Sequence, residues 1–127
     1  MWKFDSSTGW LYDPNDEPIE QGYAGGALGT RPDAVNNKAY QYTPLIGPLP
    51  VGIYTMGTPV EGTHLGPLAI PLTPDPDNTM GGRSSFYLHA DLIGKVGLRA
   101  ASEGCIVMSH ATRLLVSQST DRQLQVV

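Results

Sequence analysis

Two side chains in the second half of the chain are of the types needed for nucleophilic catalysis. Cys105 is the only cysteine among the 127 residues, and His89 lies upstream of it. A free thiol with a pKa of ~8.5 is only a few per cent thiolate at neutral pH, and a neighbouring imidazolium can lower this pKa to ~3.5–7.5. The same imidazole can return a proton to a leaving group. The pair therefore indicates a thiol nucleophile with a histidine base.

Taken singly, each of these residues has an ordinary explanation. A lone cysteine is more often a small buried apolar side chain, and a lone histidine is more often structural. Gly104 alone would indicate only a turn, but before a nucleophile it lets the N–H groups of Cys105 and its neighbours converge as an oxyanion hole. The joint occurrence of His89, Gly104 and Cys105 favours the catalytic interpretation.

The elements that must position these residues are short strands, punctuated by 15 glycines and 11 prolines. The opening of the chain is typical of a β-meander. In the strand that carries His89, alternation places Phe86 and Leu88 on one face and Tyr87 and His89 on the other. Strands are predicted at residues 2–4, 10–12, 19–23, 53–56, 68–72, 85–90 and 123–127.

Two further local features complete this prediction. Pro71 places its strand at an edge or an end, and a single helical turn is expected after Pro32. One helix is predicted from Ser109 as N-cap, with an apolar stripe formed by Ala111, Leu114 and Leu115. The expected architecture is one domain over residues 1–127, mainly β, a small barrel or sandwich with one or two short helices.

Composition and charge restrict the possible partners. The net charge of -4 and the pI of about 5.1 argue against nucleic acid, since phosphate binding needs a basic face. No apolar run approaches the ~20 residues of a membrane span, and the first residues do not form a signal peptide. The sequence predicts synthesis in the cytoplasm and no membrane insertion. A lone cysteine permits no intramolecular disulfide and no cysteine pair for zinc.

Four motifs carry a resemblance to a known family. They are Gly-Tyr-x-Gly at 22–25, Gly-Pro-x-Pro-x-Gly-x-Tyr at 47–54, Gly-Arg-Ser-x-Phe-x-x-His at 82–89 and Ser-Glu-Gly-Cys-Ile at 102–106. Together they resemble L,D-transpeptidase catalytic domains, and most closely the type VI secretion L,D-transpeptidase effectors. The resemblance extends over nearly the whole chain, and the last motif with its upstream histidine is its most specific part.

The resemblance implies an L,D-transpeptidase-like fold and acyl transfer on peptidoglycan. Cys105 would attack the carbonyl at the L-centre of diaminopimelate in a tetrapeptide stem, and His89 would protonate the departing D-alanine. Water, a free D-amino acid or the amine of a second stem would then resolve the thioester. No metal or organic cofactor is needed. The implied partners are a secretion apparatus and a periplasmic immunity protein, with action as an antibacterial toxin in the periplasm of a target bacterium.

The chain departs from the family pattern around the nucleophile. Glu103 stands where many members have histidine, Val107 where many have arginine, and Ala90 where glycine is usual. Recognition of a substrate carboxylate by arginine must therefore come from elsewhere. Arg83 is the first choice because it lies just before the histidine strand, and Arg99 and Arg113 are the others. A solvent-exposed loop arginine is an equally good explanation of Arg83.

The group that orients His89 is left open by the sequence. The resemblance implies a backbone carbonyl near the histidine; Asp91 and Ser102 are the side-chain alternatives. Beside Arg83, the candidate substrate-binding residues are Tyr87, Tyr23 and Glu103. Tyr54 is a further aromatic candidate, although aromatic residues of a small β domain more often belong to the core. His64 and His110 are interpreted as surface residues.

Two other classes of protein remain open. One is a different cysteine enzyme of the cell wall, although papain-like chains place cysteine before histidine and sortases need a different cysteine motif. The other is a non-enzymatic β module of a phage or secretion apparatus. In that case Cys105 would be buried and unreactive.

Overall fold

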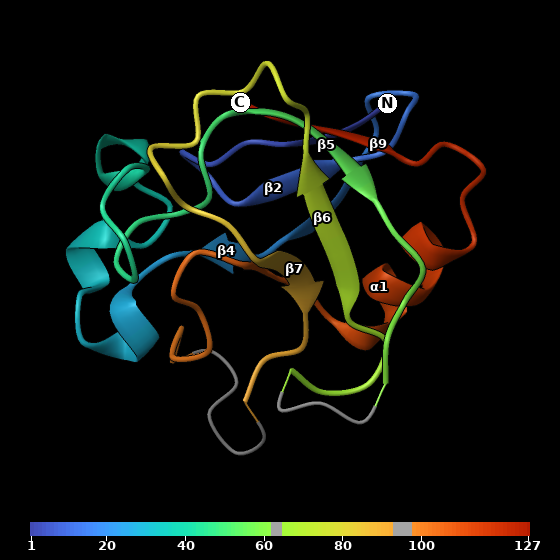
Figure 1. Cartoon of the computed structure of the whole chain (residues 1–127). Helices are drawn as coiled ribbons and strands as arrows, with labels where there is room; N and C mark the ends of the chain where they lie inside the picture. The colour runs from blue at the N-terminus through green and yellow to red at the C-terminus, as the bar shows by residue number, and fades with distance from the viewer. Residues whose placement is uncertain (62–64, 93–97) are drawn as a thin grey trace.

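The computed structural model describes residues 1–61, 65–92 and 98–127. His64 therefore lies outside the described residues. Within them a nine-stranded sheet has the order β3-β2-β1-β9-β5-β6-β7-β8-β4. Figure 1 shows the sheet curling around a core, with one α-helix packed beside it. The strands are β1 (Trp2–Phe4), β2 (Trp10–Tyr12), β3 (Pro18–Gln21), β4 (Tyr23–Ala24), β5 (Gly52–Met56), β6 (Ile70–Pro74), β7 (Phe86–His89), β8 (Ile106–Val107) and β9 (Gln123–Val126).

The sheet is a nearly closed barrel, which is one of the two mainly β architectures that the sequence predicted. The first and last strands of its order, β3 and β4, are consecutive in the chain and are separated only by Gly22. A single strand was predicted here, but the chain breaks at Gly22, where an added Cβ would lie 2.1 Å from the Val107 carbonyl oxygen. Only glycine permits this close approach of two backbones. At Gly22 the chain therefore passes from β3, at one end of the strand order, to β4 at the other end.

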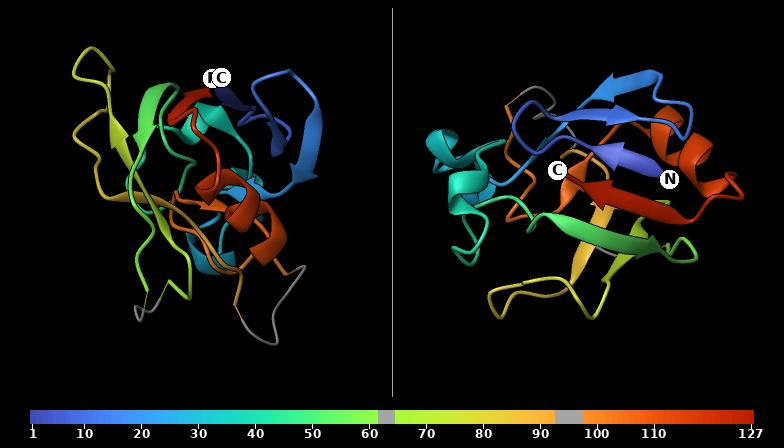
Figure 2. Two further views of the ribbon diagram at one scale, coloured as in Figure 1. Left: turned by 90° about the vertical axis from the view of Figure 1, so that its right-hand side faces the viewer. Right: turned by 90° about the horizontal axis from the view of Figure 1, so that it is seen from above.

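The predicted β-meander is confirmed, with antiparallel pairing of β1 with β2 and of β2 with β3. The predicted closing strand β9 lies between β1 and β5, parallel to β1 and antiparallel to β5. Figure 2 shows these strands of the two chain ends side by side. The two termini are thus held inside the sheet rather than at its edges.

The core is filled by alternate residues of neighbouring strands. Figure 2 shows the strands wrapping around this interior. Phe86 and Leu88 of β7 both face the core, which confirms the predicted alternation of that strand. Tyr54 is also fully buried, and its hydroxyl donates to the Pro50 carbonyl oxygen at 2.6 Å. Tyr54 is therefore a core residue and not a pocket residue.

The strand with Pro71 is not an edge strand. β6 pairs with both β5 and β7, and Pro71 lies opposite Tyr87. Proline has no N–H to donate, but it is the second residue of this strand. Its carbonyl still accepts the Gly57 N–H at 2.8 Å. The alternative prediction, a position near the strand end, is correct.

The helix α1 (His110–Ser117) begins where predicted, and the Ser109 side chain accepts a hydrogen bond from the Thr112 N–H. The predicted apolar stripe is wrong, because Ala111, Leu114 and Leu115 are exposed. Thr112, Arg113 and Val116 form the buried face instead. The buried arginine was not foreseen; its guanidinium and Nε donate to the carbonyls of Pro67, Met108 and Ser109.

Three 3-10 helices gather in the segment before β5. They are η1 (Ala27–Gly29), η2 (Pro32–Ala34) and η3 (Lys38–Tyr40), and η2 is the helical turn predicted after Pro32. None of the helices in the described ranges is long and apolar enough to cross a membrane.

Replacement of Leu88 tests the barrel core. Leu88 is 2% exposed on β7, so Leu88→Ala should lower the free energy of unfolding by about 2–5 kcal/mol, measured by urea denaturation. The matched control is Leu114→Ala on the outer face of α1, where the side chain is 41% exposed and the change should stay within about 0.5 kcal/mol. Equal effects of the two substitutions would contradict the assigned core.

Candidate active site

The pairing of β7 with β8 positions both predicted catalytic residues. The two strands are parallel, with Leu88 opposite Ile106 and His89 opposite Val107. Continuing this register by one residue places Cys105 beside Tyr87, whose N–H lies 3.3 Å from the Cys105 sulfur. Since side chains alternate along strands, Leu88 and Ile106 enter the core while Tyr87, His89 and Cys105 face the other side.

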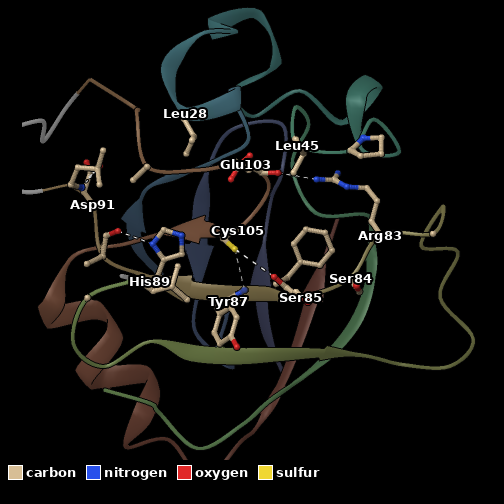
Figure 3. Close-up of a pocket in the computed structure, with 18 residues that line it drawn as sticks. Leu28, Leu45, Arg83, Ser84, Ser85, Tyr87, His89, Asp91, Glu103 and Cys105 are labelled. Atoms are coloured by element: carbon tan, nitrogen blue, oxygen red, sulfur yellow. Dashed lines mark hydrogen bonds between the residues drawn. The ribbon is translucent and has the colours of Figure 1, made fainter. Parts of the chain in front are cut away.

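That other side is a cavity of about 930 Å³ with His89 and Cys105 among its lining residues. Figure 3 shows the imidazole and the thiol pointing into it from neighbouring strands. Tyr87, Arg83, Glu103 and Asp91 also line the cavity. Tyr23 does not line this cavity but a neighbouring one of about 550 Å³.

The group seen to orient His89 is a backbone carbonyl. The Nδ1 atom lies 2.7 Å from the Ala90 oxygen, so Nδ1 is the donor in the neutral tautomer and Nε2 carries the lone pair. The His89 carbonyl in turn accepts the Met108 N–H at 3.1 Å. The imidazole is thus tied to the backbone at the end of β7 and is itself only 4% exposed.

Asp91 and Ser102, the two side-chain alternatives, are engaged elsewhere. Asp91 accepts the Tyr23 hydroxyl at 2.8 Å, and that hydroxyl accepts the Ala101 N–H at 3.0 Å. Burial is the main cause that raises the pKa of Tyr23, so the phenol stays protonated as the donor. Tyr23 and Asp91 therefore join the segment after β7 to the segment before the nucleophile.

Ser102 stabilises the turn that carries the nucleophile. Its fully buried hydroxyl accepts the Gly25 N–H at 2.8 Å and the Gly104 N–H at 3.0 Å, and it donates to the Cys105 carbonyl at 2.6 Å. The Gly104 amide is consequently engaged by this hydroxyl. Of the amides expected to form an oxyanion hole, that of Cys105 remains the candidate.

Arg83 is not the exposed loop residue that the sequence left as an alternative. It is only 8% exposed, and its four terminal hydrogen bonds go to the carbonyls of Gln41, Gly47, Pro48 and Glu103. These contacts engage the donors with which a guanidinium would grip a carboxylate. Arg99 and Arg113 both line the second cavity and do not line the Cys105 cavity.

The environment of the thiol favours its neutral form. Burial raises the pKa of Cys105, and the Glu103 carboxylate acts in the same direction. The Tyr87 N–H, the positive charge of Arg83 and the Cys105 N–H lower this pKa without cancelling the effect of burial. The partly buried thiol therefore needs a base to form the thiolate, and His89 in the same cavity is the candidate.

Sequence reasoning missed the apolar rim of the cavity. Leu28 and Leu45 are 52% and 63% exposed, and both line the cavity in Figure 3. Their φ angles are 56° and 64°, in the left-handed region that leucine rarely adopts. The glycine-rich run 25–29 was a signal of unusual backbone near Leu28, but nothing in the sequence related either leucine to Cys105. His110, predicted at the surface, is exposed.

A β-barrel with a strand-end histidine and a cysteine just before the neighbouring strand is the arrangement of an L,D-transpeptidase-like protein. Residues 29–127 match the family model described as the Tlde1 domain. The chain therefore belongs to the Tlde1 family of type VI secretion L,D-transpeptidase effectors. Membership implies an L,D-transpeptidase-like enzyme that acts on peptidoglycan and is secreted. No curated protein matches the chain. In the described ranges, no group of three or more His, Cys, Asp or Glu could hold a metal ion.

Gly104→Ala tests the turn before the nucleophile. Gly104 has φ 143°, and an added Cβ would lie 2.5 Å from Nη2 of Arg83. We expect the free energy of unfolding to fall by about 1–3 kcal/mol in thermal or urea denaturation, because the backbone is strained and a buried guanidinium must shift. Gly57→Ala is the control, since its Cβ would meet its nearest neighbour at 3.5 Å. Wild-type stability of Gly104→Ala would contradict the assigned geometry.

Proposed function

We propose that this protein is an L,D-carboxypeptidase or D-amino-acid exchange enzyme that acts on peptidoglycan tetrapeptides through a thioester on Cys105. The observation that carries the proposal is the β7–β8 register, which places His89 and Cys105 in one cavity. Family membership supplies the substrate class.

The first half of the reaction forms the thioester. Because burial keeps the thiol neutral, Nε2 of His89 takes the Cys105 proton as the sulfur attacks the carbonyl of the diaminopimelate L-centre. The Cys105 N–H is the proposed donor to the oxyanion. The tetrahedral intermediate then expels D-alanine, whose amine receives the proton from His89.

The second half returns the enzyme to its resting state. With His89 as base, water attacks the thioester, releases a tripeptide stem and restores the thiol. A D-amino acid in place of water yields an exchanged tetrapeptide, and the amine of a second stem yields a cross-link. The first two outcomes remove the tetrapeptide donors that a growing wall requires, which suits an antibacterial toxin.

The Ala90 carbonyl supports this assignment of roles. It bonds Nδ1 of His89 and thereby leaves Nε2 as the basic nitrogen of the neutral imidazole. Asp91 acts in the proposal only through its bond to Tyr23, as a support for the cavity wall. Tyr87 and Glu103 remain candidate substrate-binding residues, because both line the cavity.

Muropeptide analysis tests the chemistry. Incubation of tetrapeptide-rich peptidoglycan with the protein should convert tetrapeptides to tripeptides, or to exchanged tetrapeptides when a D-amino acid is added. Cys105→Ala and His89→Gln should abolish conversion, and Cys105→Ala should keep its stability within about 1 kcal/mol because the cysteine is partly exposed. Near wild-type turnover by Cys105→Ala would show that the cysteine is structural.

A second experiment tests the place of action. Because peptidoglycan lies outside the cytoplasm, the protein expressed there should be nearly harmless, whereas fusion to a secretory signal should cause swelling or lysis that depends on Cys105 and His89. A periplasmic immunity protein that covers the cavity should suppress this effect. Equal toxicity from both compartments would favour a cytosolic substrate.

A further inference from the structure

Arg83 lies beside the turn that carries the nucleophile and bonds its backbone. Its Nη1 atom donates to the carbonyls of Gln41 and Pro48 at 2.7 and 2.8 Å, and its Nη2 atom donates to those of Gly47 and Glu103 at 3.1 and 3.0 Å. One buried group thus joins the segment 41–48 to the residues just before Cys105. Figure 3 shows the guanidinium reaching toward Glu103 from the side of the cavity.

Packing around Gly104 makes this contact close. A Cβ on Gly104 would lie 2.5 Å from Nη2 of Arg83, so the guanidinium rests against the backbone of the residue that precedes the nucleophile. The Leu49 N–H adds a second link to the same turn, donating to the Gly104 carbonyl at 3.0 Å. The Arg83 guanidinium also lies 5.1 Å from the ring centroid of Phe86 on the histidine strand.

The charge of Arg83 is satisfied by carbonyl dipoles and not by a carboxylate. Within the described residues, none of the ion pairs includes Arg83. A buried cation is costly unless its donors are bonded, and here four hydrogen bonds meet that requirement. Because no carboxylate of the described residues pairs with it, its positive charge acts on the nearby sulfur and lowers the pKa of Cys105.

We infer that Arg83 is a positioning residue for Cys105, which fixes the nucleophile turn against the wall formed by residues 41–48 and holds a positive charge near the sulfur. The inference rests on the proposed thiol chemistry. It replaces recognition of a substrate carboxylate as the role of this arginine. A lysine cannot reproduce the arrangement, because a single ammonium lacks the planar fork that spans four carbonyls.

The test combines thiol reactivity with steady-state kinetics for wild type, Arg83→Gln and Arg83→Lys. The rate of Cys105 alkylation by iodoacetamide is measured against pH, and kcat and KM are measured on tetrapeptide muropeptides. In Arg83→Gln the lost charge should move the alkylation midpoint upward by about one pH unit. At a pH below the midpoint, the rate of alkylation should then fall about tenfold. Arg83→Lys should keep a midpoint near wild type but lose kcat, with KM little changed.

Arg122 provides the matched control. It also donates to four carbonyls, those of Met56, Gly57, Val116 and Ser119, but it does not line the Cys105 cavity. Arg122→Gln and Arg122→Lys should therefore lower stability while leaving the alkylation midpoint unchanged. A comparison at matched thermal stability separates loss of positioning from general destabilisation.

An unchanged alkylation midpoint in folded Arg83→Gln would overturn the inference. A rise in KM with kcat unchanged would also overturn it, because that result would indicate that Arg83 binds a substrate carboxylate. If Arg83→Gln does not fold, the kinetics of Arg83→Lys test the inference: a loss of kcat with KM little changed supports it, and a rise in KM with kcat unchanged rejects it. Alkylation needs no peptidoglycan, so a shifted midpoint in a protein inactive on muropeptides would support the role of Arg83 and reject the proposed function. Cys105-dependent activity with no shift of the alkylation midpoint would support the proposed function and reject the role of Arg83.

Discussion

The parallel hydrogen bonding between β7 and β8 is the constraint on which the site depends. It places Leu88 beside Ile106 in the core, and the same register places Cys105 one residue before β8, within reach of the Tyr87 amide. A shift of one residue would turn the cysteine or the histidine toward the core. The apolar packing of the barrel therefore also sets the geometry of the reacting groups.

The support of the site comes largely from backbone groups. The Ala90 carbonyl orients His89, while Arg83 and Ser102 satisfy the polar atoms of the turn before Cys105. This explains how the chain tolerates alanine where the family usually has glycine after the histidine, since either residue supplies the carbonyl.

Partial burial of the Cys105 thiol affects its ionisation. Partial withdrawal of Cys105 from water raises the pKa of its thiol, and the positive charge of Arg83 acts in the opposite direction. The apolar rim that includes Leu28 and Leu45 contributes to the same low-polarity surroundings. In such a site a proton transfer within the cavity requires less reorganisation than one in open solvent.

The sequence by itself determined the mainly β class, most strands, the N-cap at Ser109 and the candidate pair, because alternation, glycine and proline punctuation, capping and motif spacing are local signals. Tertiary structure alone decided the partners of Arg83, Ser102 and Asp91, since each binds groups far away in the chain. It also decided which face of α1 is buried: three carbonyls draw Arg113 inward and leave Leu114 and Leu115 outside. Long-range contacts of backbone carbonyls leave no pattern in the sequence, because every residue carries the same carbonyl group.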